Sequence, residues 1–368
     1  MPPGFEKLAV SELNEKLPGL EVTSVEKGGL NVVAPMAVAL AFHTVLKIPT
    51  AVRLRIDEFK SRDFPRLFNK IQSIRWNQFL VSDKYELSVQ CSKSRLLNEK
   101  RVETAVRDGI TRFFAKQPPK KVKDAAALTI HVRFFDDLCS LSIDLSGEPL
   151  FKRGYKSLAG IAPIRENLAA ALFYSLWRAS GSNLETLIDP LCGTGTLLLE
   201  AQMFFQYVKA RTFGYEVRAD WLPVEVQTPE PTPGPRWFYG FDREPKALQS
   251  AMESLGSIAE VGRVDKSNWV LAQRDLFEAT DSFEVKGDRR ALICNPPYGE
   301  RIKMPKKPEV YYSEMREALA RFSAKAMGVI VPKALVKLWP EAFSGYSLYE
   351  KLPFENGGIE VVFLVYRR

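Results

Sequence analysis

Short apolar runs and segments of helical periodicity alternate along the C-terminal part of this 368-residue chain, and this alternation restricts the fold more than any other feature. From residue 165 onward, the strand-like runs at 186–189, 237–241 and 291–294 are each followed by a turn or loop and then by apolar residues recurring every three or four positions. The last two strand runs follow each other with no helix between them, which predicts an antiparallel pair at one sheet edge. We therefore predict an α/β fold with a doubly wound, mostly parallel sheet.

The first 150 residues have a different organisation, that of a smaller α+β part. Their periodicities predict helices over 3–17, 37–45, 61–80 (ending near 74–76) and 98–115. They also predict two short strands within 21–33, on either side of residues 27–29, and strands over 51–59, 85–91, 128–134 and 139–144. Between the first and second strands of the C-terminal part, residues 211–236 contain five prolines and no clear period. We predict this stretch to be a solvent-exposed insertion, with a loop that contacts substrate as the alternative.

The net charge of +8 is unevenly distributed. Residues 1–154 carry 25 Lys or Arg and 18 Asp or Glu, whereas residues 155–368 carry 27 and 26. A basic part joined to a nearly neutral part is consistent with a polyanion-binding module next to a catalytic one, although a merely soluble surface would have the same balance.

The composition excludes several classes of protein. With 46% hydrophobic and 26% charged residues, the chain is neither disordered nor collagen-like. No apolar run is long enough for a membrane helix, and no charged leader with an apolar core opens the chain. Four well-separated cysteines and two histidines make a metal site unexpected. We predict a cytoplasmic protein; its oligomeric state is not indicated.

A glycine-rich turn joins the first strand of the C-terminal part to its helix. Residues 189–196 read Asp-Pro-Leu-Cys-Gly-Thr-Gly-Thr, in which Gly193 and Gly195 allow a sharp turn and a close approach to a ligand. The turn lacks both the Lys-Ser/Thr ending of a phosphate-binding loop and the third glycine of a dinucleotide fingerprint. With Asp189 at the strand end, it suits an adenosyl ligand that bears an amino acid; a purely structural turn is the alternative.

Acidic residues also follow the next two strands. Asp242 ends the strand at 237–241, where a carboxylate can accept hydrogen bonds from both ribose hydroxyls. Asp275 follows the strand at 269–271 and could accept from an adenine amino group. Either residue alone could simply cap a helix. Three acidic strand ends in order favour a nucleoside-binding edge.

The most specific signal is Asn-Pro-Pro-Tyr at residues 295–298, directly after an apolar strand. Pro296 and Pro297 stiffen the loop and have no backbone N–H, which leaves carbonyl acceptors. Asn295 adds a side-chain acceptor and Tyr298 an aromatic face. Such a loop can bind the NH2 group and the ring of a base that has left its stack, with the amine lone pair aimed at an electrophilic methyl group.

Together, residues 189–196 and 295–298 resemble the S-adenosylmethionine-dependent amino-methyltransferases. Residues 147–155 and 162–169 resemble a narrower branch, the THUMP-domain-containing RNA guanine-N2 methyltransferases, in particular the N-terminal half of the bacterial 23S rRNA guanine-N2 enzymes. The resemblance extends over essentially the whole chain and is looser in 1–140.

The resemblance implies a domain organisation. A ferredoxin-like α+β element (residues 1–55) and a THUMP RNA-binding domain (56–150) would lead through a connector (151–165) into a methyltransferase domain (166–368). The last would contain a seven-stranded Rossmann-like class I methyltransferase sheet.

The resemblance also implies roles for individual residues. The cofactor S-adenosylmethionine would be bound by Pro163, Arg165, Asn167, Asp189, Pro190, Cys192, Gly193, Gly195, Thr196, Asp242, Asp275 and Asn295. The target base would be held by Asn295, Pro296, Pro297 and Tyr298. RNA phosphates would be contacted by Lys93, Arg95, Lys100, Lys120, Lys121, Lys152 and Arg153, which are chosen by charge and position only.

The reaction implied is an in-line transfer of the methyl group to the N2 amine of a flipped-out guanine in 23S rRNA, catalysed by positioning and electrostatics. Three alternatives remain open. They are a tRNA guanine-N2 methyltransferase, a DNA adenine-N6 methyltransferase, and an RNA-binding factor without catalytic activity.

Overall fold

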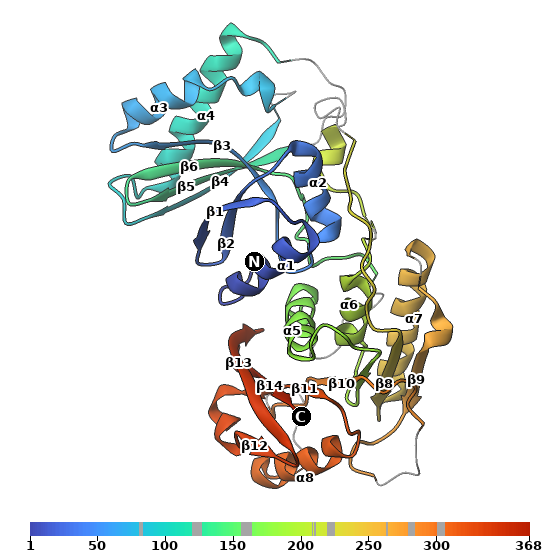
Figure 1. Cartoon of the computed structure of the whole chain (residues 1–368). Helices are drawn as coiled ribbons and strands as arrows, with labels where there is room; N and C mark the ends of the chain where they lie inside the picture. The colour runs from blue at the N-terminus through green and yellow to red at the C-terminus, as the bar shows by residue number, and fades with distance from the viewer. Residues whose placement is uncertain are drawn as a thin grey trace. The chain divides into compact units, whose positions relative to one another are not determined.

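The structure is a computed structural model of the whole chain (Figure 1). It describes residues 1–80, 84–119, 127–155, 164–207, 209, 211–218, 225–262, 264–278, 284–299 and 306–368. These residues form two compact units, which we describe separately. Unit 1 comprises Met1–Thr50, Phe151–Arg211 and Gln227–Arg368, and unit 2 comprises Ala51–Leu150 and Thr212–Val226.

Unit 1 is built on an eight-stranded sheet with the order β12-β13-β14-β11-β10-β7-β8-β9. Its strands are β7 (Thr186–Asp189), β8 (Trp237–Asp242), β9 (Trp269–Gln273), β10 (Arg290–Cys294), β11 (Ala326–Pro332), β12 (Ala342–Phe343), β13 (Tyr346–Asn356) and β14 (Ile359–Arg367). The strands from β11 to β9 are parallel, whereas β14 and β13 are antiparallel. The predicted α/β sheet with an antiparallel edge is confirmed, and the two-residue β12 extends the expected seven strands to eight.

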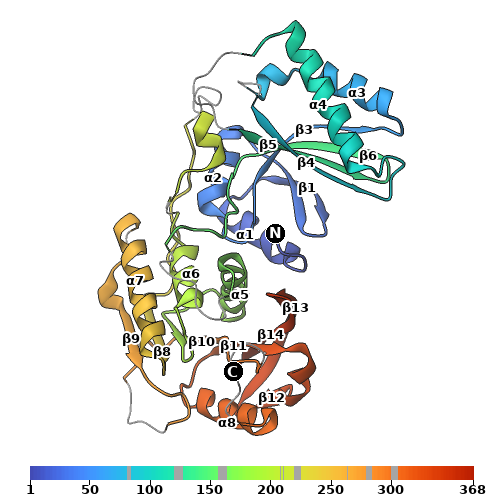
Figure 2. The same cartoon turned by 180° about the vertical axis from the view of Figure 1, so that it is seen from behind.

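Helices cover both faces of this sheet, as Figures 1 and 2 show. One face carries α5 (Glu166–Ala179), α6 (Thr196–Phe204) and α7 (Pro245–Val261), and the other carries α8 (Pro308–Ala320). Neighbouring residues of one strand therefore enter different cores: Leu187 packs under α5 to α7, and Ile188 packs with α8. Because both faces are buried, the strands read as continuous apolar runs. Short 3-10 turns complete the unit: η3 (Lys266–Asn268) and η4 (Lys333–Leu338).

Residues 1–50 belong to unit 1. They form α1 (Glu6–Lys16), the hairpin of β1 (Glu21–Glu26) and β2 (Gly29–Val33), and α2 (Met36–Val45). Phe5 and Leu8, at the start of α1, join the same core as α5 and α6. The domain boundaries inferred from the resemblance remain predictions. The boundary at 55/56 needs correction, because it falls inside β3 (Arg53–Lys60), a strand that pairs within unit 2.

Unit 2 contains a four-stranded sheet of order β3-β6-β5-β4. Its other elements are α3 (Phe64–Ser73), η1 (Trp76–Gln78), β4 (Tyr85–Ser92), α4 (Glu99–Lys116), β5 (Leu128–Phe135), β6 (Leu138–Asp144) and η2 (Gly214–Arg218). Strands β4 and β5 are parallel and joined through α4, and β6 is antiparallel to both its neighbours. Asp63 and Asn98 begin the helices by accepting the backbone N–H of Arg66 and Arg101, at 2.7 and 3.1 Å.

The helix predicted over 61–80, with its end near residues 74–76, is α3, which begins later than predicted and ends close to the predicted position. Helix α3 ends at Ser73, Ile74 is extended, and a separate 3-10 turn follows. The indole N–H of the buried Trp76 donates to the carbonyl of Ile71 at 2.7 Å. The side chain thus satisfies a carbonyl of the last helical turn, and the chain turns inward so that Trp76 can be buried.

The insertion at 211–236 is likewise not a wholly exposed decoration. Phe213 and Tyr215 are buried, and their rings stack with centroids 5.9 Å apart. The N–H groups of Gly214 and Tyr215 donate to the carbonyls of Ser146 and Leu145 at 3.1 and 2.9 Å. The first part of the insertion is therefore an integral element of unit 2. Residues 219–224 lie outside the described residues.

The close approach at Gly214 allows a test of this docking. A Cβ atom at Gly214 would lie 2.9 Å from the backbone nitrogen of Gly147, and backbone cannot rotate away. We expect Gly214→Ala to lower the free energy of unfolding by about 1–3 kcal/mol and to accelerate tryptic cleavage at Arg211 and Arg218. Gly256→Ala in α7, where the nearest atom would be 3.8 Å away, is the control; because alanine is the better helix former, it should not lower the free energy of unfolding, and it should leave the cleavage rate unchanged. Equal cleavage of both variants would contradict the docking.

Candidate active site

Four neighbouring parallel strands, β10, β7, β8 and β9, carry the predicted cofactor- and base-binding residues at one edge of the sheet. Asp189 ends β7 and pairs in register with Gly240, two residues before Asp242 at the end of β8. Asp275 follows the end of β9 by two residues, and Asn295 directly follows β10. Strand order reverses between β7 and β10, and the crevice at such a switch point is where open α/β sheets bind their ligands.

The glycine turn is fixed by contacts with the end of β8. The N–H of Cys192 donates to the carbonyl of Phe241 at 2.8 Å, and the N–H of Gly193 donates to Oδ2 of Asp242 at 2.8 Å. Gly193 and Gly195 have φ of 51° and 76°, in the left-handed region that favours glycine. Asp189 accepts the N–H of Leu191 at 3.1 Å and so holds the start of the same turn.

Asp242 retains capacity for a ligand. Its Oδ2 accepts the N–H of Gly193, and its Oδ1 accepts the N–H of Glu244 at 2.9 Å. A carboxylate offers about four acceptor positions, so two remain for a pair of ribose hydroxyls. Asp275 is similar, since its Oδ1 accepts the N–H of Phe277 at 2.9 Å and its other oxygen has no such bond among the described residues.

The Asn-Pro-Pro-Tyr loop brings its two polar side chains together. The hydroxyl of Tyr298 donates to Oδ1 of Asn295, and the Tyr298 ring packs against the core beneath α5 and α6. Asn295 and Tyr298 are half-buried, whereas Pro296 is buried. A base amine that binds at Oδ1 of Asn295 must share or displace the tyrosine hydroxyl.

The residues at this edge fit an adenosyl ligand. An added Cβ at Gly193 would meet no atom within 4 Å, so there is open space beside the backbone of the turn. The side chains of Asp189 and Asp242 bond to this turn, and Asp275 follows the end of the next strand in the sheet. Their oxygens are the kind of acceptor that ribose hydroxyls, an adenine amine and an amino-acid ammonium group require. Thr196, the first residue of α6, is buried behind the turn.

Two cysteines at the edge are unsuited to nucleophilic chemistry. Burial raises the pKa of the Cys192 thiol well above its ordinary value, and the charges of Asp189 and Asp242 raise it further. Burial and Asp189 do the same for the pKa of Cys294. Both thiols therefore stay protonated at neutral pH, and a thiol is a far weaker nucleophile than a thiolate.

Asp189 should make stability depend on pH. Burial raises its pKa well above the ordinary value, and the charge of Asp242 adds to the shift. The folded chain then holds a proton that the unfolded chain releases, so this stabilisation is complete below the unfolded pKa and is lost as pH rises through the folded pKa. We expect the free energy of unfolding to fall across this window in the wild type and to be flatter in Asp189→Asn. Urea titrations at a series of pH values above the ordinary pKa of an aspartate measure this difference, and parallel curves would contradict it.

Three residues before and at the start of α5 are predicted to bind the cofactor, and the structure bears on each of them differently. Pro163 lies outside the described residues. Arg165 is the exposed N-cap residue of α5, with its guanidinium 5.8 Å from the ring centroid of Phe151. The Asn167 amide nitrogen donates to the carbonyl of Ile48 and the hydroxyl of Thr50, at 3.3 and 3.2 Å. That amide therefore ties α5 to residues 48–50, and a cofactor role for Asn167 stays a prediction.

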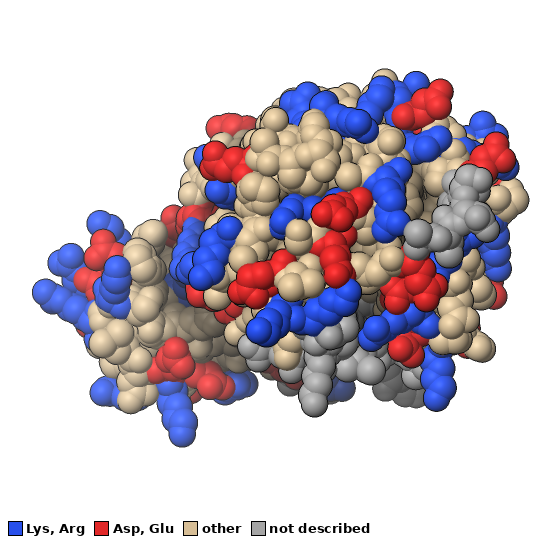
Figure 3. Space-filling model, turned by 90° about the horizontal axis from the view of Figure 1, so that it is seen from below, with Lys and Arg blue, Asp and Glu red and all other residues tan. Residues whose placement is uncertain are grey.

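The candidate RNA-binding residues differ in their exposure. Lys93, Arg95, Lys100 and Lys152 are exposed, and Lys120 and Lys121 lie outside the described residues. The prediction that Arg153 contacts RNA needs correction, because this side chain is 8% exposed and its guanidinium is bonded to Glu200 and to the carbonyl of Lys47. A buried, paired guanidinium cannot contact a phosphate. On the face shown in Figure 3, basic and acidic side chains are interspersed.

Sequence reasoning missed the partner of Arg153. Glu200 is fully buried in α6, where it is the single charged residue among nine. A carboxylate inside an apolar helix must bond to a buried donor or cation. A single glutamate in an otherwise uncharged helical segment could therefore have indicated a buried partner such as Arg153. Among the described residues, no group of three or more His, Cys, Asp or Glu is placed to hold a metal ion, and no helix is long and apolar enough to cross a membrane.

Known protein sequences resemble this chain. A family described as "RMKL-like, methyltransferase domain" matches residues 153–359. The "Ribosomal RNA large subunit methyltransferase K/L" of Vibrio cholerae is 32% identical over 266 residues, which are 67% of this chain and 36% of the relative. The protein of the same name from Aliivibrio fischeri is 29% identical over 334 residues, 86% of this chain and 46% of the relative. The chain thus spans less than half the length of these relatives.

Solved structures share the fold over nearly the whole chain. A possible methylase from Clostridium difficile 630 superposes with a TM-score of 0.76 at 23% identity, covering 100% of this chain and 96% of the other. SMU.472, solved in complex with SAH, superposes with a TM-score of 0.74 at 22% identity, covering 99% and 95%. At these identities the likeness concerns the fold.

Proposed function

Because this chain belongs to the RMKL-like methyltransferase domain family, we propose that it transfers the methyl group of S-adenosylmethionine to the exocyclic N2 of a guanine in 23S rRNA. The membership agrees with the resemblance seen in residues 189–196 and 295–298. The observation that carries the proposal is the meeting of three acidic strand ends with the Asn-Pro-Pro-Tyr loop along one edge of four parallel strands. The names of the curated relatives support rRNA as the substrate.

The cofactor would lie along the ends of β7, β8 and β9. The two remaining acceptor positions of Asp242 suit the ribose hydroxyls, and the unused oxygen of Asp275 suits the adenine amine. The glycine turn and Asp189 would receive the methionine end. Bound there, S-adenosylmethionine supplies an electrophilic methyl group on a positively charged sulfur.

The base would be held at the end of β10. Oδ1 of Asn295 and the carbonyl of Pro296 accept the two hydrogens of the amine, and the Tyr298 ring stacks on the base. The lone pair of a guanine amine is delocalised into the ring, which makes it a poor nucleophile. Acceptors that hold the hydrogens out of the ring plane direct the lone pair toward the methyl group. Catalysis then consists of positioning and electrostatic stabilisation.

The RNA would be bound through unit 2. Residues 51–150 carry 19 Lys or Arg and 13 Asp or Glu, whereas residues 1–50 carry four and five. The excess positive charge of the N-terminal part therefore belongs to unit 2. Lys93, Arg95 and Lys100 lie in and after the loop that follows β4, where their side chains are exposed. Contacts of this kind position an RNA on the protein without reading its sequence. An rRNA substrate also implies a cytoplasmic location.

The test is transfer of a labelled methyl group to unmodified large-subunit rRNA, bulk tRNA and double-stranded DNA, followed by nucleoside analysis. N2-methylguanosine in rRNA alone is the expected result. Label in tRNA would retain the chemistry and change the substrate, and N6-methyladenine in DNA would overturn the assignment of unit 2. Cofactor binding without any transfer would indicate an RNA-binding factor that lacks catalysis.

A further inference from the structure

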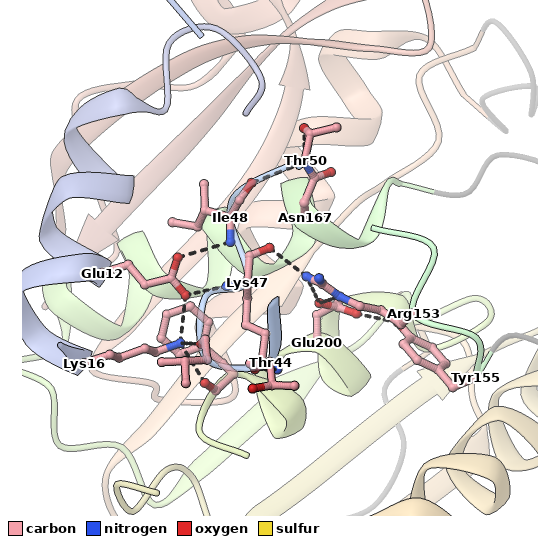
Figure 4. A network of polar contacts seen from close by, with 12 residues as sticks. Glu12, Lys16, Thr44, Lys47, Ile48, Thr50, Arg153, Tyr155, Asn167 and Glu200 are labelled. Carbon is pink, nitrogen blue, oxygen red and sulfur yellow. Dashed lines mark hydrogen bonds and ion pairs between the residues drawn. The ribbon is translucent and has the colours of Figure 1, made fainter. Parts of the chain in front are cut away.

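The helix that begins at the glycine turn of the proposed cofactor site contains a buried carboxylate. Glu200 is in the second turn of α6, five residues after Gly195, and no part of it is exposed. Its Oε1 accepts the hydroxyl of Tyr155 at 2.8 Å, and its Oε2 accepts Nη2 and Nε of Arg153 at 3.2 and 3.4 Å. Figure 4 shows Arg153 and Tyr155 converging on this one carboxylate. We name Arg153, Tyr155 and Glu200 the Glu200 cluster.

The Glu200 cluster joins two stretches of chain that flank the proposed site. Glu200 belongs to α6, the helix that begins at the glycine turn. Arg153 and Tyr155 belong to the stretch that leads toward α5, and the ring of Phe151 in that stretch lies 5.8 Å from the guanidinium of Arg165. Arg165 is the N-cap residue of α5 and a predicted cofactor contact. Glu200 therefore ties α6 to residues 153–155.

Residues 44–48 form hydrogen bonds with the cluster and with α1. Nη2 of Arg153 also donates to the carbonyl of Lys47 at 2.6 Å, and Nζ of Lys47 donates to the carbonyl of Thr44 at 2.6 Å (Figure 4). The N–H groups of Lys47 and Ile48 donate to the carboxylate of Glu12 at 2.7 and 3.1 Å. Helix α1 and the end of α2 thus hold the backbone that Arg153 contacts.

The charges in this region make its geometry rigid. Among the described residues, Lys16, Lys47 and Arg153 face two buried carboxylates, Glu12 and Glu200. Burial lowers the pKa of Lys47 well below its ordinary value, and the charges of Arg153 and Lys16 lower it further. Loss of one partner would leave a buried charge uncompensated, which costs far more than the pair itself contributes. Buried polar networks that are fully bonded fix one arrangement of the chain.

We propose that Glu200, held by Arg153 and Tyr155, is a positioning residue of the cofactor site, fixing the glycine turn at the start of α6 relative to residues 151–155, of which Phe151 contacts the Arg165 guanidinium. The Glu200 cluster touches neither the cofactor nor the base. It acts by holding two parts of the site in a fixed arrangement before the cofactor binds, so that ordering them does not reduce the free energy of binding. The inference rests on the proposed function only in assuming that the site binds an adenosyl cofactor.

Two tyrosines offer a matched test. Tyr155 and Tyr346 are 3% and 1% exposed, and each donates one hydrogen bond through its hydroxyl, to Glu200 at 2.8 Å and to the carbonyl of Ala324 at 2.7 Å. Ala324 precedes β11 and so lies at the opposite edge of the sheet from the proposed site. We expect Tyr155→Phe to raise the Kd for S-adenosylhomocysteine about fivefold, the worth of one buried hydrogen bond, and Tyr346→Phe to change it less than twofold.

The measurement is isothermal titration calorimetry on the full chain without RNA, together with the melting temperature of each variant. A similar loss of melting temperature in both variants with weaker binding in Tyr155→Phe alone would support positioning. Equal Kd values for the two variants and the wild type would overturn it while leaving the proposed function in place. Absence of binding by the wild type would overturn both. If Tyr155→Phe fails to fold, Arg153→Lys keeps the charge, loses the paired contacts with Glu200, and takes its place.

Discussion

Replacing Asn295 by alanine is expected to reduce methyl transfer at least about a hundredfold while changing the affinity for S-adenosylhomocysteine less than about threefold. Asn295 follows β10, and its Oδ1 accepts the hydroxyl of Tyr298 within the loop. Without that acceptor the amine of the base loses one of two groups that orient its lone pair. The glycine turn and Asp242, which would bind the cofactor, keep their own contacts.

Single-turnover methyl transfer and calorimetry on the same preparation separate the two effects. Asn268→Ala is the matched control, because Asn268 is also half-buried and lies in η3 at the opposite edge of the sheet, before β9 begins. This variant should transfer methyl groups normally. If Asn295→Ala lost cofactor affinity and transfer to the same degree, Asn295 would belong to the cofactor site rather than to the base site.

Replacing Asp242 by alanine is expected to raise the Kd for S-adenosylhomocysteine at least about a hundredfold. The change removes the acceptors for two ribose hydroxyls, and hydrogen bonds to a charged group contribute about 1.5–3 kcal/mol each. It also releases the N–H groups of Gly193 and Glu244, at 2.8 and 2.9 Å, so the glycine turn loses one of its two hydrogen bonds to the end of β8. Both effects weaken binding.

Asp265→Ala is the control for the loss of an acidic capping residue. Asp265 accepts the N–H and the hydroxyl of Ser267 at 2.9 and 2.6 Å, much as Asp242 accepts backbone N–H groups, but it lies before β9 at the other edge of the sheet. Its replacement should lower stability slightly and leave the Kd unchanged. A Kd for Asp242→Ala within threefold of the wild type would show that the end of β8 does not bind the ribose.

Much of the site could be predicted because its signals are local. The motifs at 189–196 and 295–298 each follow a strand whose apolar run is visible in the sequence, and parallel strands place such ends at one edge. The caps Asp63 and Asn98 likewise act within three residues of themselves. The burial of Arg153 could not be predicted from such signals, since a lysine–arginine pair in a connector is typical of an exposed basic patch.

The sequence by itself determined the order of strands and helices, the parallel sheet with its antiparallel edge, and which strand ends carry polar residues. These follow from periodicities of two and 3.6 residues and from turn chemistry, which act over a few positions. The tertiary structure alone decided that Arg153 is buried against Glu200, 47 residues away, that residues 213–215 pack on 145–147, and that residues 1–50 belong to unit 1. Each depends on a partner distant in the chain, because burial of a charge or a loop is favourable only where the folded chain brings a complementary group to it.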